Sequence, residues 1–230
     1  MSYDFKDLKD SVRAYIGRSP NALIEYADED SITSFINRRR DEWAELTRCF
    51  YEEKGTFTLA ANTPTYDMES ASFSRPFFLI EQLTIEAAPL RTLTGNVGEV
   101  SQRQLFDQSP THQTANAQKP AYWSFSPPRS IRFWPTPDAA YDDCYVSGYY
   151  YPTPLVGDGD NTLLSRGEFD IFSRWCAAGA LNPIRDDDDA KRFQWLRAEG
   201  DAYIKNKQMK MEALAISKMY SRGNRTRVSV

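Results

Sequence analysis

The middle of the chain reads Pro120-Ala-Tyr-Trp-Ser-Phe-Ser-Pro-Pro-Arg-Ser-Ile-Arg-Phe-Trp-Pro-Thr-Pro-Asp138, and it resumes shortly afterwards as Tyr145-Val-Ser-Gly-Tyr-Tyr-Tyr-Pro-Thr-Pro-Leu155. Aromatic and β-branched residues alternate here with small or polar ones, and Pro or Gly recurs every few residues. This pattern predicts short antiparallel strands. Helical periodicity returns from about Ser165, so the strand-rich block is expected to lie between two helical blocks.

The composition is that of an ordinary globular chain. Its 230 residues, of which 26% are charged, are enough for one large domain or two small ones. The formal net charge of −4 argues against a protein that coats nucleic acid with its whole surface. No apolar run is long enough to predict a transmembrane helix. The first residues are acidic and polar, unlike a secretory signal, so we expect synthesis and retention in the cytoplasm of the producing cell.

Four segments outside the strand-rich block have helical periodicity. The first, Tyr3–Gly17, places its apolar residues three and four positions apart. The second is expected to open after the run Asp28–Ser31, with Asp30 or Ser31 as the cap. The third begins at Glu168, and the fourth runs from about Asp187 to Tyr220.

The period changes to two from Gly55. Thr56–Leu59 and Thr65–Met68 are expected to pair as a hairpin. Further strands are expected at Phe77–Glu86, Tyr122–Phe125, Ser130–Trp134 and Asp143–Tyr151. Val97–Phe106 has one apolar edge, which predicts a short helix, whereas Asp107–Lys119 is polar and without any period, which predicts an exposed loop.

The predicted fold class is therefore α+β: a helical bundle from the N- and C-terminal segments, an inserted antiparallel β domain and a flexible C-terminal arm. Each helix has one apolar face that another helix must cover, so the two helical ends are expected to form one bundle. The expected bounds are 1–50 and 165–217 for the bundle, 51–164 for the insert and 218–230 for the arm. The expected core-packing residues are Trp43, Trp175, Phe35 and Phe172.

No pattern of nucleophiles or bases predicts catalysis. Cys49, Cys144 and Cys176 are far apart and indicate reduced core thiols. His112 is the single histidine and lies in the polar loop, away from any nucleophile pattern. Phosphate-binding glycine loops, zinc-protease motifs and hydrolase elbows are absent. The sequence therefore predicts a protein that is not an enzyme and binds no cofactor.

Two acidic runs were candidates for metal binding. Asp158-Gly-Asp-Asn161 is similar to part of a calcium loop, but Glu168 does not stand at the spacing that the loop requires, so a solvated turn is favoured. Asp186–Asp189 fall on consecutive helical positions, which point about 100° apart and do not converge on one ion. The sequence predicts no metal site.

The basic C-terminus has two interpretations on charge alone. Arg222, Arg225 and Arg227 lie in a segment without period and of opposite sign to the rest of the chain. Such a segment is either a frayed terminus or a docking arm. The aromatic block is also able to stack bases in principle, but only Arg129 and Arg132 lie within it, which favours a β core or a protein contact.

The order of these parts resembles the head-to-tail adaptor, or connector, proteins of tailed bacteriophages. The resemblance covers most of residues 1–217. It is carried by Phe35-Ile-Asn37, Trp43, Thr56 to Tyr66, Pro120-Ala-Tyr122, Ile131-Arg-Phe-Trp-Pro-Thr-Pro-Asp138, Tyr149-Tyr-Tyr-Pro-Thr-Pro-Leu155, Asn161-Thr-Leu-Leu164 and the helix Glu168 to Leu181.

The resemblance implies a structural virion protein. Members of that family are not enzymes; they form rings, usually dodecameric, at the head-tail junction. It implies that this chain contacts the portal protein and a downstream tail or stopper protein, continues the channel through which DNA passes without sequence recognition, and docks into the portal through its C-terminal arm. We expect Arg222, Arg225 and Arg227 of that arm to meet carboxylates of the portal. A second hypothesis is a carbohydrate- or peptide-binding module that uses the aromatic strands Tyr122 to Tyr151.

Overall fold

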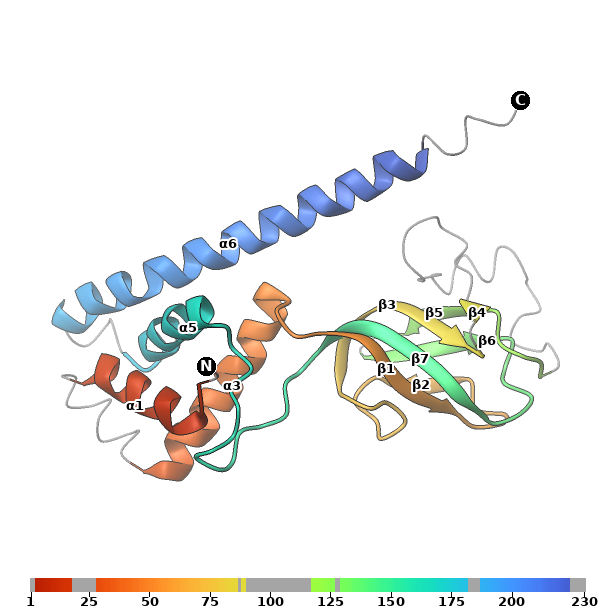
Figure 1. Ribbon diagram of the computed structural model, residues 1–230, viewed down its shortest axis with the longest axis horizontal. Helices are drawn as coiled ribbons and strands as arrows, with labels where there is room; N and C mark the ends of the chain where they lie inside the picture. The colour runs from red at the N-terminus through yellow and green to blue at the C-terminus, as the bar shows by residue number, and fades with distance from the viewer. Residues whose placement is uncertain are drawn as a thin grey trace. The chain divides into compact units, whose positions relative to one another are not determined.

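The computed structural model describes residues 3–17, 28–86, 88–89, 117–126, 129–181 and 187–223. Contacts divide the chain into a helical unit, Met1–Thr47 with Thr153–Ile216, and a β unit, Arg48–Pro152, with which Ser217–Val230 is grouped. Four helices and two antiparallel sheets confirm the expected α+β class (Figure 1). Val97–Phe106, His112, Arg225 and Arg227 lie outside the described residues.

The helices of the helical unit begin at capping residues. α1 (Phe5–Ile16) is capped by Asp4, whose carboxylate accepts a hydrogen bond from the Asp7 backbone N–H. α5 (Arg166–Ala178) opens with a capping box between Ser165 and Glu168. The remaining helices are α3 (Glu29–Thr47) and α6 (Asp187–Gly223).

The expected cap of α3 was wrong by two or three residues. The side chain of Asp28, rather than that of Asp30 or Ser31, accepts hydrogen bonds from the backbone N–H groups of Asp30 and Ser31. Any of the acidic or hydroxyl residues in this run has the chemistry of a cap, so composition alone did not identify which one comes first.

The core of the helical unit is aromatic. The side chains of Trp43, Phe172, Trp175 and Phe35 are buried. The ring centroid of Trp43 lies 5.5 Å from that of Phe172 and 5.3 Å from that of Trp175, and Trp43 stacks on Tyr203 of α6. Because α3, α5 and α6 all supply rings to this cluster, the core joins segments that are more than 100 residues apart in sequence.

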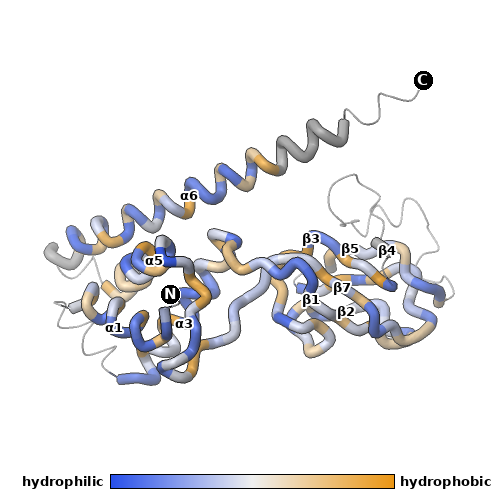
Figure 2. The backbone as a smooth tube through the Cα atoms, in the orientation of Figure 1, coloured by the Kyte–Doolittle hydropathy of each residue, from blue (hydrophilic) through white to orange (hydrophobic). Residues whose placement is uncertain are grey.

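α6 packs on the helical unit through its first half. Leu196, Gly200 and Ile204 are buried, and the Cα of Gly200 lies against the Trp175 ring. From Gln208 to Leu214 the residues are exposed, except for the half-buried Met211. Apolar residues are scattered along the described length of the helix rather than gathered at its packed end (Figure 2).

α6 also continues beyond its expected end. The arm was expected to begin at residue 218, but the helix runs to Gly223. No Gly or Pro interrupts residues 218 to 222, so the backbone continues as helix until a glycine permits its end. Arg222 therefore belongs to the last turn of α6.

Replacing Gly200 with alanine is expected to lower the free energy of unfolding by about 1–2 kcal/mol. A Cβ atom there would lie 2.6–2.8 Å from the Cδ1, Cβ and Cγ atoms of Trp175, which outweighs the helix propensity that alanine adds. Urea unfolding followed by circular dichroism measures the change. The control is Gly167→Ala in α5, where nothing lies within 4 Å and a gain of about 0.5–1 kcal/mol is expected. Equal stabilisation by both changes would contradict the described docking of α6.

Two antiparallel sheets form the β unit. The first has the strand order β1-β7-β3-β4 and the second β2-β6-β5. The bounds are β1 Tyr51–Leu59, β2 Thr65–Asp67, β3 Phe77–Ile85, β4 Ala88–Pro89, β5 Tyr122–Ser126, β6 Ser130–Trp134 and β7 Tyr141–Tyr150. The rings of Phe57 in β1 and Phe133 in β6 stack at 5.9 Å, so the inner faces of the two sheets share one core.

The expected hairpin between Thr56–Leu59 and Thr65–Met68 was wrong. β1 pairs with β7, and β2 pairs with β6, so the two segments belong to different sheets. The chain thus enters the β unit along β1 and leaves it along the adjacent β7, with Tyr51 opposite Tyr149. Next to this pair, the Tyr150 backbone N–H donates to the Phe50 carbonyl.

Candidate functional site

All three cysteines are free thiols, and Cys144 and Cys176 are buried, whereas Cys49, also expected in the core, is only half-buried. Burial raises the pKa of the Cys144 and Cys176 thiols to about 12, so neither is a thiolate at neutral pH. In the described part of the chain, no group of three or more His, Cys, Asp or Glu side chains is placed to hold a metal ion. In the same part, no helix is both long and apolar enough to span a bilayer.

The acidic motif Asp158–Asn161 forms a turn. The Asp160 carboxylate accepts hydrogen bonds from the backbone N–H groups of Val156 and Gly157, which hold the pKa of that carboxyl below its usual value. The Asp158 carboxylate lies 2.6 Å from Lys9 Nζ. The Asp160 carboxylate therefore binds backbone N–H groups and the Asp158 carboxylate binds a lysine, so the two do not converge on a metal ion.

This turn belongs to a segment, Thr153–Leu164, that we call the anchored loop. The Asn37 side chain donates to the Leu155 carbonyl and accepts from the Leu155 N–H, at 2.9 and 2.8 Å. The guanidinium of Arg40, which is only 1% exposed, donates to the carbonyl groups of Thr153 and Thr162. These bonds place residues 153–164 with the helices, whereas the sequence analysis had placed them in the insert.

Lys9 ties the anchored loop to two helices. Its ammonium group, on a side chain 8% exposed, bonds Asp158 at 2.6 Å and Glu29 at 2.7 Å. The hydrogen bond to Asp158, followed by that to Glu29, raises the Lys9 pKa above 10.5. Hydrogen bonds from Lys9 and then Arg13 lower the Glu29 pKa below 4.5. Lys9 and Glu29 are therefore both charged across neutral pH.

Replacing Lys9 with methionine is expected to cost about 1–2 kcal/mol of unfolding free energy at pH 7, a modest figure because both carboxylates stay accessible to water. The raised Lys9 pKa means that its contribution is complete below pH 10.5 and lost as pH rises through the folded value. The lowered Glu29 pKa means that its contribution is complete above pH 4.5 and lost as pH falls through the folded value.

Urea unfolding should accordingly give free energies of unfolding for the wild type and for Lys9→Met that differ by a constant amount between about pH 5 and 10. The two values should converge outside that window. The control is Lys6→Met, an exposed lysine on the same helix, with little effect at any pH. A difference between wild type and Lys9→Met that grows as pH falls below 4 would contradict the described ion pairs.

The structure brings together only some of the residues singled out from the sequence. Trp43, Trp175, Phe35 and Phe172 lie in the core of the helical unit. Arg222 lies in the last turn of α6, while Arg225 and Arg227 are outside the described residues. Asn37, Arg40 and Lys9 were missed as anchoring residues, because a single polar position on an amphipathic helix gives no sign of the loop that it will bind.

The aromatic strands contribute mostly to the core. Trp123, Phe133 and Tyr150 are buried. A partly exposed cluster remains on the first sheet at Tyr51, Phe78, Tyr149 and Tyr151. The ring of Tyr149 makes an angle of 62° with that of Tyr51, and Phe78 makes one of 45° with Tyr151. Other partly exposed rings stack, however: Phe78 lies at 30° to Tyr149, and Tyr122 lies at 28° to Trp134 on the second sheet.

The comparisons with known proteins agree with this arrangement. The family model described as SU10 adaptor protein matches residues 3–227, which include both units and the whole of α6. No curated protein matches the chain. The match confirms the resemblance to phage adaptors noted from the sequence. The chain belongs to the SU10 adaptor protein family.

Proposed function

We propose that this protein is a head-to-tail adaptor of a tailed bacteriophage: a structural virion protein that forms a ring, joins the portal to the tail and continues the DNA channel. The observation that carries this proposal is the extent of the family match, from residue 3 to residue 227. It covers the helical unit, the inserted β unit and the last helix, rather than one common module. We expect a dodecamer, made in the host cytoplasm and assembled at the head-tail junction.

The chemistry of the described residues supports a structural role without catalysis or cofactors. Its buried thiols are protonated, and the carboxylates of the Asp158–Asn161 turn serve backbone and lysine donors. The family match over nearly the whole chain favours an adaptor over the alternative of a sugar-binding module. The partly exposed rings on the first sheet suit a contact with another protein, such as the downstream tail or stopper protein.

The portal contact is assigned to the arm, residues 218–230. Arg222, Arg225 and Arg227 have planar guanidinium groups that bond carboxylates in pairs, and the proposal places acidic portal side chains opposite them. The buried residues of α6, Leu196, Gly200 and Ile204, all precede Gln208, which supports this role because the described core of the helical unit contains no residue of the arm. The arm therefore serves binding rather than the stability of the subunit.

Truncation after Met219 is expected to leave the melting temperature unchanged and to weaken binding to purified portal rings at least tenfold. The triple change of Arg222, Arg225 and Arg227 to Gln should do the same, and the wild-type affinity should fall as salt is raised. A charge-matched control replaces the exposed Lys6, Lys54 and Lys191 with Gln. Native mass spectrometry of the mixtures reports the ring. Unaltered portal binding by the truncated chain would refute the arm, and the absence of any ring, alone or on the portal, would refute the function.

A further inference from the structure

The anchored loop displays two aliphatic side chains that its own subunit does not cover. Leu155 is 3% exposed and the next residue, Val156, is 81% exposed. Thr162 is fully buried and the next residue, Leu163, is 52% exposed. In both pairs, a buried residue whose backbone makes hydrogen bonds is followed by an exposed apolar residue. Leu155 and Thr162 thus fix the loop, and Val156 and Leu163 face the solvent.

The backbone at Leu163 is strained in a way that favours this display. Its φ of 59° lies in the left-handed region, which is unfavourable for a leucine. The Leu163 N–H donates to the Asn161 side chain at 2.9 Å, and the Thr162 N–H donates to the Tyr3 carbonyl at 3.1 Å. Glycine or asparagine would adopt this conformation at lower cost. A strained, exposed leucine held in place by its neighbours indicates a binding role.

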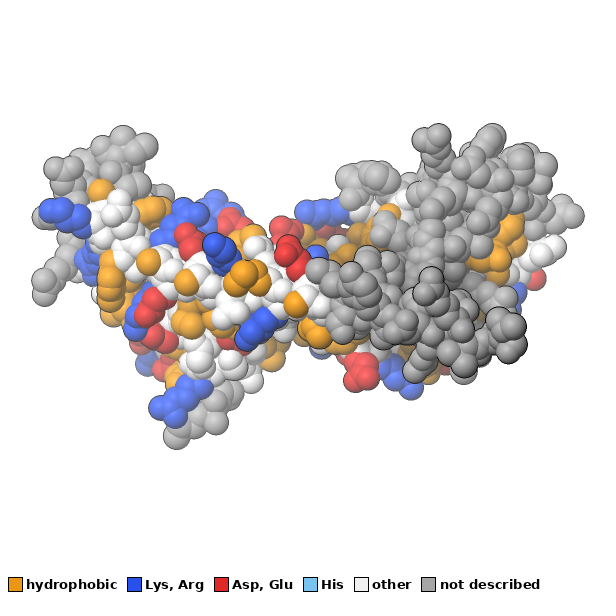
Figure 3. Space-filling model, turned by 90° about the horizontal axis from the view of Figure 1, so that it is seen from above, with side chains coloured by type: hydrophobic (Ala, Val, Ile, Leu, Met, Phe, Trp, Pro, Cys, Tyr) orange, Lys and Arg blue, Asp and Glu red, His pale blue; other side chains and the backbone are white. Residues whose placement is uncertain are grey.

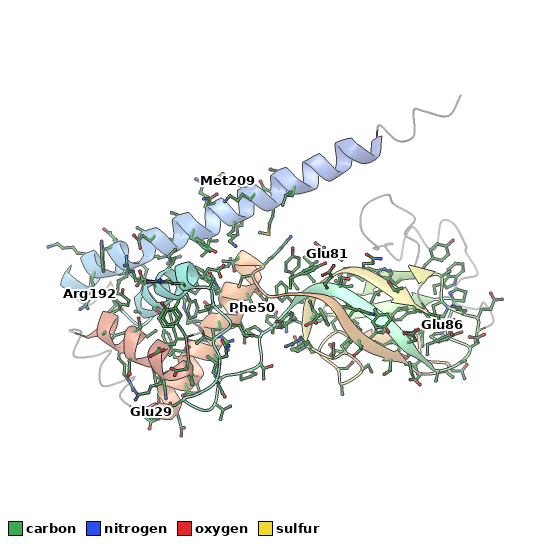
Figure 4. All side chains as sticks on the ribbon, viewed as in Figure 1. Glu29, Phe50, Glu81, Glu86, Arg192 and Met209 are labelled. Atoms are coloured by element: carbon green, nitrogen blue, oxygen red, sulfur yellow. The ribbon has the colours of Figure 1, made fainter. Side chains whose placement is uncertain are left out.

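α6 carries a second uncovered apolar surface. Trp195, Ala202 and Met209 are exposed and recur every seven residues, so they share one side of the helix, which we call the α6 stripe. Gly200 and Ile204, which pack on the helical unit, lie on the opposite side. Figure 4 shows Met209 on the side of α6 that faces away from α5, and Figure 3 shows hydrophobic side chains spaced along the described part of α6.

The two surfaces carry opposite charges. Around the turn, the carboxylates of Asp158, Asp160 and Asp28–Asp30 outnumber the two cations paired with them, Lys9 and Arg13. Between Asp201 and Glu212, α6 carries Lys205, Lys207 and Lys210. Two apolar surfaces with opposite charges at their margins bind each other more favourably than either one binds an identical surface.

The two surfaces also lie on different parts of the helical unit. The anchored loop is bound by α1 and α3, through Lys9, Asn37 and Arg40. α6 packs on α5, through Gly200 against Trp175, and on the Trp43 ring of α3 through Tyr203. Figure 1 shows the loop that follows β7 and α6 on opposite sides of this unit. A ring needs such a pair of different, complementary surfaces on every subunit.

We propose that the anchored loop of one subunit docks on the α6 stripe of the next, with Val156 and Leu163 against Met209 and the loop aspartates beside Lys205 and Lys210. This contact rests on the proposed ring. The occupant of each surface is thus a second copy of the chain, and neither surface is left for the portal.

Disulfide trapping tests the contact in the full-length chain. A variant with Leu163→Cys and Met209→Cys, assembled with purified portal rings and oxidised, should give a ladder of covalent multimers on a non-reducing gel. Each single variant gives at most a dimer. The control pairs Leu163→Cys with Leu214→Cys, which is 61% exposed but lies on the other side of α6. The native Cys144 and Cys176 are buried, and Cys49, which is only half-buried, is replaced by Ser in every variant of this experiment.

The outcomes separate this contact from the proposed function. Rings seen by native mass spectrometry without a 163–209 ladder, or with a ladder only in the 163–214 control, overturn the contact and leave the adaptor function standing. Absence of rings in the wild type, with and without portal, overturns both. Leu163→Gly gives an independent measurement: glycine relieves the backbone, so the melting temperature should hold or rise, while ring assembly weakens about tenfold. Unchanged assembly by this variant also overturns the contact.

Discussion

Trp43→Ala is expected to lower the free energy of unfolding by about 3–5 kcal/mol, among the largest effects of any single change in the helical unit. Trp43 has no exposed surface, and it contacts rings from α5 and α6 at 5.3–5.5 Å between centroids. Its indole N–H has no hydrogen-bond partner in the described part of the chain, so packing supplies the stabilisation. Urea unfolding followed by tryptophan fluorescence and circular dichroism measures the change.

The matched control is Trp195→Ala, which removes the same side chain from a site that is 60% exposed. Trp195 contacts Arg174 across 5.5 Å, a cation–π contact of small value in water. Its loss should change the free energy of unfolding by less than about 1 kcal/mol. A loss below about 1 kcal/mol for Trp43→Ala would mean that the two helical ends do not form one bundle.

Gly148→Ala is expected to destabilise the β unit by about 3 kcal/mol or more. Gly148 stands in β7, between Glu52 of β1 and Ile80 of β3. A Cβ atom there would lie 2.4 Å from the Leu79 carbonyl oxygen and 3.0 Å from the Ile80 Cα. Both atoms belong to the backbone of β3, so no change of rotamer relieves the overlap and the sheet itself must shift.

The control for this change is Gly159→Ala, at a turn position with nothing within 4 Å of the added Cβ. Its expected effect is within about 0.5 kcal/mol. Thermal unfolding followed in the near ultraviolet, where the aromatic residues of the β unit report, compares the two variants. Similar melting temperatures for both would show that β1 and β3 do not both pair with β7 at Gly148.

The helices were predictable because their signals are local. α1, α3, α5 and α6 each begin within three residues of the expected start, and in α1, α3 and α5 a capping side chain lies there. The end of α6 was missed because the sequence after Tyr220 has no apolar period, although the helix continues to Gly223.

Strand pairing was not predictable in the same way. Alternation in Thr56–Leu59 and Thr65–Met68 correctly indicated strands, and it says nothing of their partners. The partner of β1 is β7, which lies more than 80 residues later in the chain. The same limit applies to the anchored loop, since Asn37 and Arg40 bind carbonyl groups that are more than 100 residues away.

The pairing of β1 with β7 affects the order in which the two units fold during synthesis. The seven described strands all lie within the continuous stretch Arg48–Pro152, so both sheets can form as soon as Pro152 has left the ribosome. The ring cluster around Trp43 has to wait for α5, roughly 120 residues after the end of α3, a delay on the order of 6–24 s at ribosomal speed. We therefore expect nascent chains stalled before Arg166 to hold a folded β unit beside unpaired α1 and α3, whose apolar faces are open to chaperones during that interval.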